Sequence, residues 1–96
     1  MKSYLLEPIQ SQDNAIAALT SALPGQTEPW LLKDSSGDAI AYFSLEPSEH
    51  QKGMFSICAD LSGRHFNKDS EVISVLKNIG KTTGGKIIDD WDNLIE

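Results

Sequence analysis

The stretch Trp30–Leu45, WLLKDSSGDAIAYFSL, decides the fold class that the sequence predicts. Two runs of aromatic and aliphatic residues, 30–33 and 39–45, have the composition that favours β-strands. Residues 34–38 between them are short and polar apart from Gly37, and such residues are typical of a tight turn. This stretch therefore predicts a β-hairpin.

A third strand is predicted for residues 54–61, after a polar loop. Its apolar and polar residues alternate: Phe55, Ile57, Ala59 and Leu61 would face one way, and Ser56, Cys58 and Asp60 the other. Because successive side chains of a strand point to opposite faces, one face of this strand would enter the core. Shorter strands are predicted at 3–7, where Pro8 would end the strand, and at 86–89.

Two helices are predicted, one before and one after these three strands. The first spans residues 12–23 with Ser11 as its N-cap, and the second spans 69–82 with Asn67 or Asp69 as its cap. The apolar residues at helical spacing are Ile16, Leu19 and Leu23 in the first helix, and Val72, Val75, Leu76 and Ile79 in the second. Gly84-Gly85 would end the second helix.

The resulting element order, β-α-β-β-β-α-β, predicts an α+β protein and one domain over residues 1–96. We expect a two-layer sandwich, with both helices on one face of a mostly antiparallel sheet of four to five strands. This order resembles a ferredoxin-like fold, which is a split β-α-β arrangement, with one extra strand. The resemblance implies no activity, because that fold serves many functions.

Charge and hydropathy exclude several classes of function. Eight basic and fourteen acidic residues give a net charge of −6, which argues against nucleic-acid binding. The longest uncharged stretch, 14–27, is broken by Pro24-Gly25, and the apolar run at 4–6 is too short for a signal sequence. We therefore expect no membrane partner and a cytoplasmic location.

No motif predicts catalysis, a metal site or a cofactor. The single cysteine, Cys58, can form neither an intrachain disulfide nor a cysteine-based zinc site. The alternating oxygens of Asp34, Ser36 and Asp38 lack the rest of a calcium-binding loop. His50 and His65 are interpreted as surface residues. We expect no cofactor.

The leading hypothesis is a non-catalytic protein-binding domain. Residues 87–96 contain four acids and no base, and an acidic surface accelerates association with a basic partner. In size, acidity and lack of active-site motifs the chain is similar to inhibitor or immunity-type proteins of bacteria. The expected partner-binding residues are Asp89, Asp90, Trp91, Asp92 and Glu96, with Trp91 as the aromatic anchor.

The sheet face away from the helices supports an alternative. Either orientation of the strand at 39–45 leaves Tyr42 or Phe43 on that face, unless the segment Trp91–Ile95 covers it. A small ligand or substrate could bind there, in one version at a homodimer interface. The residues expected to contact it are Tyr42, Cys58, Asp60, Arg64 and His65. A homo-oligomeric structural protein is the third alternative.

Overall fold

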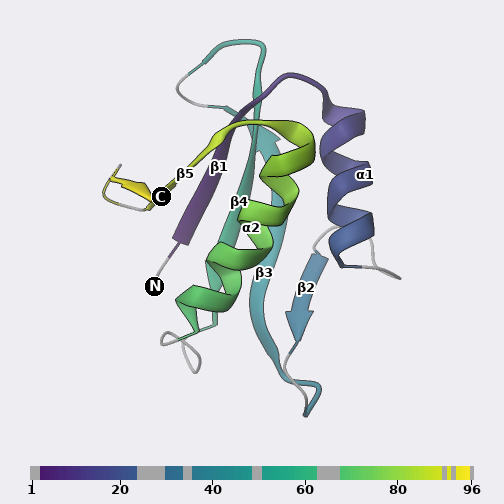
Figure 1. Cartoon of the computed structure of the whole chain (residues 1–96), viewed down its shortest axis with the longest axis vertical. Helices are drawn as coiled ribbons and strands as arrows, with labels where there is room; N and C mark the ends of the chain where they lie inside the picture. The colour runs from purple at the N-terminus through teal and green to yellow at the C-terminus, as the bar shows by residue number, and fades with distance from the viewer. Residues whose placement is uncertain are drawn as a thin grey trace.

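The computed structural model describes residues 3–23, 30–33, 36–48, 51–62, 68–89, 91 and 93–95 (Figure 1). Within these residues the protein is α+β, with two helices and six strands in one antiparallel open sheet. The strands are β1 (Ser3–Ile9), β2 (Trp30–Lys33), β3 (Ala39–Pro47), β4 (Phe55–Leu61), β5 (Lys86–Asp89) and β6 (Leu94–Ile95). The helices are α1 (Gln12–Ala22) and α2 (Asp69–Thr83).

The sheet has the order β2-β3-β4-β1-β5-β6, and the predicted hairpin is its β2–β3 pair. The expectation of four to five strands is wrong, because the chain turns back after β5 and adds β6 at the edge. Ile87 pairs with Ile95, and Ile88 pairs with Leu94. A strand of two residues is too short to produce an alternating pattern, so the sequence does not reveal it.

Strand β1 continues through Pro8 to Ile9, so the predicted end at Pro8 is wrong. The register of β1 against β4 shifts between Leu6 and Ile9, and Ile9 pairs with Phe55 beyond the shift. Proline has no N–H to donate to a neighbouring strand, and an irregularity of this kind is where a strand tolerates it.

The buried core contains residues of the sheet and of both helices, and α1 and α2 contact each other (Figure 1). Pairing between β3 and β4 places Phe43 beside Ala59 on the helix side. The fully buried large side chains include Leu6, Leu19, Phe43, Ile57 and Leu76. Tyr42, one residue from Phe43, is 44% exposed on the other face.

Helix α1 begins as predicted, since the Ser11 hydroxyl accepts the backbone N–H of Asn14 at 3.2 Å. Its buried residues are Ala15, Ala18 and Leu19, whereas Ile16 is 39% exposed, so placing Ile16 on the buried stripe was wrong. The buried face of α1 is therefore centred on small alanine side chains, which allow a helix to approach its neighbours closely.

Helix α2 buries Val72, Leu76 and Ile79, as predicted, and leaves Val75 half-buried. The helix ends at Thr83, and the N–H of Gly84 donates to the carbonyl of Gly80 at 2.8 Å. Asp69 is not the N-cap: it is the first helical residue, and its carboxylate accepts the hydroxyl of Tyr4 at 2.8 Å. The other predicted cap, Asn67, lies outside the described residues.

Candidate functional site

The turn between β5 and β6 is organised by one carboxylate. Asp89 Oδ1 accepts the backbone N–H groups of Trp91 and Asn93, both at 2.9 Å. The backbone N–H of Asp89 donates to the carbonyl oxygen of Asn93 at 3.0 Å. Aspartate commonly stabilises turns in this way, by accepting the N–H groups that follow it. The turn that carries Trp91 is therefore held by hydrogen bonds at both ends.

The same hydrogen bonds keep Asp89 ionised. The backbone N–H of Asn93, and then that of Trp91, hold the pKa of Asp89 below its usual value of 3.8, although partial burial opposes them. The sequence predicts Asp89 as a partner-binding residue. In the structure its charge also stabilises the turn, a role that the acidic composition of the segment does not indicate.

The two most exposed large hydrophobic side chains among the described residues lie on this hairpin. Trp91 is 82% exposed and Leu94 is 51% exposed. Because β6 pairs with the edge of the sheet, the segment extends the sheet instead of covering its open face. Large exposed apolar side chains on one short segment are typical of contact surfaces. We call Trp91, Leu94 and the turn between them the C-terminal hairpin tip.

Several residues singled out from the sequence lie outside the described part of the chain. They are Asp90, Asp92 and Glu96 of the acidic segment, Arg64 and His65 of the alternative site, and His50. Their participation in binding stays a prediction.

The open sheet face brings together three residues of the alternative site. Tyr42 pairs with Asp60 across β3 and β4, and Cys58, two residues from Asp60, lies on the same face. The hydroxyl of Ser3 donates to Asp60 Oδ1 at 2.5 Å. Four surface grooves of the described part of the chain are lined by residues other than Tyr42, Cys58 and Asp60.

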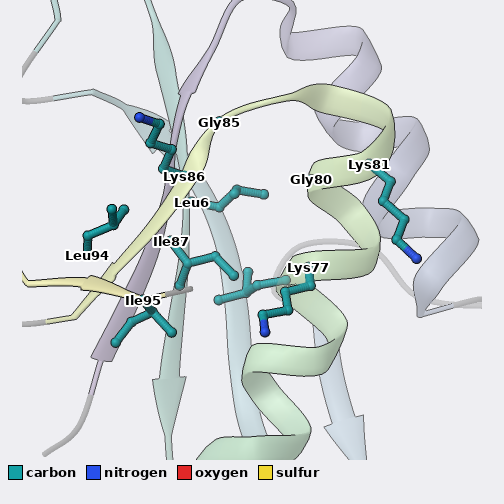
Figure 2. A pocket seen from close by; sticks show the side chains of 10 residues that line it. Leu6, Lys77, Gly80, Lys81, Gly85, Lys86, Ile87, Leu94 and Ile95 are labelled. Carbon is teal, nitrogen blue, oxygen red and sulfur yellow. The ribbon is translucent and has the colours of Figure 1, made fainter.

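One surface groove lies between α2 and the β5–β6 hairpin, and its volume is about 480 Å³ (Figure 2). We call it the α2 groove. Its apolar lining consists of Leu6, Leu76, Ile87, Leu94 and Ile95, and Gly80 and Gly85 add bare backbone. Its remaining residues are Lys77, Lys81 and Lys86. Residues 64–86 carry four lysines and two acids, but this excess does not by itself predict a groove.

A second groove, of about 400 Å³, lies on the other side of β5 and β6. Lys86 and Leu94 line both grooves, so the hairpin forms a wall between them. The second groove also contains Glu7, which is 8% exposed and accepts the hydroxyl of Ser48 at 2.7 Å. Its lining thus mixes polar and apolar groups.

Within the described residues, no three His, Cys, Asp or Glu side chains lie close enough together to hold a metal ion. No helix in that part of the chain has the length and apolar character needed to cross a membrane.

The fold and the hairpin tip define a small α+β protein with exposed apolar side chains at one edge of an antiparallel sheet. The chain matches no protein-family model and is not significantly similar to any curated protein.

Proposed function

We propose that this chain is a non-catalytic protein-binding domain and that its C-terminal hairpin tip contacts the partner. The observation that carries the proposal is the 82% exposure of Trp91 on a turn fixed by Asp89. Tryptophan is the residue type most enriched among the side chains that dominate binding energy at interfaces. Leu94, 51% exposed and three residues further along, enlarges the apolar surface that binding would bury.

Preorganisation of the turn supports the same proposal. Binding is weakened whenever a loop must be ordered in the complex. The hydrogen bonds from Trp91 and Asn93 to Asp89 order this turn before a partner arrives. More of the energy from burying the indole ring then contributes to affinity.

The proposed partner is basic. Residues 87–96 carry four acids, Asp89, Asp90, Asp92 and Glu96, and no base. Such a segment attracts a positively charged surface and raises the association rate, most strongly at low salt. An inhibitor or immunity-type protein of a bacterium, acting in the cytoplasm, is the specific form of this proposal.

We also propose the finer description of the fold, a two-layer ferredoxin-like sandwich with added edge strands. With β2 and β6 set aside, the elements follow the order β-α-β-β-α-β. Strand β4 separates β1 from β3, and β1 separates β4 from β5, which supports a split arrangement. An experimental structure with β2 between β1 and β4 would contradict this description.

Capture from a lysate of the cells that encode the protein tests the binding proposal. The tagged chain should retain a stable partner, and Trp91→Ala should lose that partner. The matched control is Ile16→Ala, which removes another exposed apolar side chain from α1. If both variants capture the same protein equally well, the hairpin tip is not the contact site.

The second candidate function is a ligand site on the open sheet face, formed by Tyr42, Cys58 and Asp60, with a homodimer as one version. The pairing of Tyr42 with Asp60 favours this candidate because it places a phenol beside a carboxylate. Sedimentation velocity at several concentrations tests the dimer version. A concentration-dependent dimer that Tyr42→Lys disrupts would support it, and a monomer at every concentration would exclude it.

A further inference from the structure

The α2 groove has a lining of one chemical character. Apart from its three lysines, the lining consists of aliphatic side chains and glycines. Among the described residues that form it there is no acid, no aromatic ring, and no hydroxyl or amide side chain. Its volume of about 480 Å³ falls within the usual range of small-ligand sites, about 300–1,000 Å³.

This lining selects against ligands with many hydrogen-bonding groups. A sugar, a nucleotide or a peptide backbone would lose hydrogen bonds to water on entering the groove and find few replacements. A flat aromatic ligand would find no aromatic side chain there to pack against. An unbranched aliphatic chain lacks such groups and gains from the burial of apolar surface.

The charged residues of the groove are all cations, although the whole chain has a net charge of −6. Figure 2 shows the Lys77 side chain extending along the groove beside the aliphatic floor, whereas Lys81 and Lys86 direct their ammonium groups away from it. Lys86 lies opposite Glu7 in the β1–β5 register, whereas Lys77 and Lys81 are exposed on α2. An anionic group on the ligand is therefore favoured near Lys77, and a cationic group is disfavoured.

We propose that the α2 groove binds a free single-chain fatty carboxylate, with the aliphatic chain along the floor and the carboxylate at Lys77. Leu6 and Leu76 are at most 1% exposed, so they close the floor but offer little surface. The ligand gains its contacts mainly from Ile95, Leu94 and the methylene stems of the lysines. Binding is consequently weak, with a dissociation constant on the order of 1 mM for a twelve-carbon chain.

Titration of the full chain with dodecanoate below its micelle concentration, followed by amide NMR shifts, tests this proposal. We expect saturable shifts at Gly80, Ile87 and Ile95. Lys77→Glu should weaken dodecanoate binding about threefold or more, as expected for an exposed ion pair. The matched control is Lys52→Glu, an equal charge change at an exposed residue outside the groove, and it should leave binding nearly unchanged.

A second ligand separates the effect of the head-group charge from the effect of the aliphatic chain. Dodecyltrimethylammonium has the same aliphatic chain and a positive head group, so it should bind the wild type more weakly than dodecanoate and bind Lys77→Glu more tightly. Equal binding of the two head groups would overturn the proposal. So would shifts confined to Trp91 and Tyr42, or an absence of saturable shifts. All of these outcomes are independent of whether the hairpin tip binds a protein.

Discussion

Asp89 and Asn93 hold each other across the β5–β6 turn through reciprocal hydrogen bonds. The N–H of Asn93 donates to Asp89 Oδ1 at 2.9 Å, and the N–H of Asp89 donates to the carbonyl of Asn93 at 3.0 Å. The residue that this turn presents is Trp91. The proposed binding surface therefore depends on the carboxylate of Asp89, two residues before the tryptophan, which accepts hydrogen bonds within the turn.

Replacing that carboxylate should loosen the hairpin tip without unfolding the protein. In Asp89→Ala the N–H groups of Trp91 and Asn93 lose their acceptor, so their hydrogen exchange should accelerate several-fold. Exchange in α2 should not change. Glu46→Gln, which neutralises an exposed acid on β3, is the matched control. Unchanged exchange at Asn93 in Asp89→Ala would show that the carboxylate does not hold the turn.

The hairpin tip should also loosen in acid, at a pH set by Asp89. The folded protein holds the pKa of Asp89 below the usual 3.8, so the ionised carboxylate stabilises the turn above that pH. This stabilisation is lost as the pH falls through the lowered pKa. An NMR titration of the Asn93 amide should show a midpoint below 3.8, and Asp89→Asn should lack the transition. A midpoint at or above 3.8 in the wild type would contradict the assigned cause.

Gly85 and Gly84 offer a matched pair for testing how α2 connects to β5. Both have positive φ, +93° at Gly85 and +79° at Gly84. An added Cβ at Gly85 would lie 3.2 Å from the carbonyl oxygen of Pro8, whereas at Gly84 it would meet nothing within 4 Å. Gly84→Ala should lower the free energy of unfolding by about 1–3 kcal/mol through backbone strain alone.

Gly85→Ala should cost more than Gly84→Ala, because the atoms it would meet belong to the β1 backbone and cannot move aside cheaply. Urea unfolding of the two variants measures the difference. Equal losses would mean that β1 and β5 are not as close at this point as the structure places them.

Gly80→Ala should stabilise the protein. Gly80 lies inside α2, where glycine costs roughly 0.5–1 kcal/mol relative to alanine. An added Cβ would lie 3.5 Å from Leu6 Cδ1, which is an ordinary van der Waals contact. The midpoint of urea unfolding should therefore rise. A fall would indicate that α2 packs more tightly on β1 than this distance allows.

The sequence predicts the regular elements well, because their patterns repeat over many residues. Helix α2 was expected at 69–82 and is observed at Asp69–Thr83, and the β2–β3 hairpin lies where its turn residues indicate. The alternation in β4 correctly separates Ile57 and Ala59, both buried in the core, from Cys58 on the open face.

What the sequence could not predict depends on contacts between distant residues. The path of β1 through Pro8 requires the register shift against β4, and β6 requires the turn at Asp89. Ile16 is exposed because the buried face of α1 carries Ala15, Ala18 and Leu19. The α2 groove is lined by residues of β1, α2, β5 and β6, and no local sequence pattern predicts that these elements lie together.

The central claim, that the hairpin tip contacts a protein partner, is tested most directly by the dissociation constant of the captured partner. The measurement compares wild type, Trp91→Ala and Ile16→Ala. We predict that Trp91→Ala weakens binding by about thirtyfold or more, the effect of losing an anchor worth about 2 kcal/mol, and that Ile16→Ala changes it less than about twofold. Equal dissociation constants for wild type and Trp91→Ala would contradict the account.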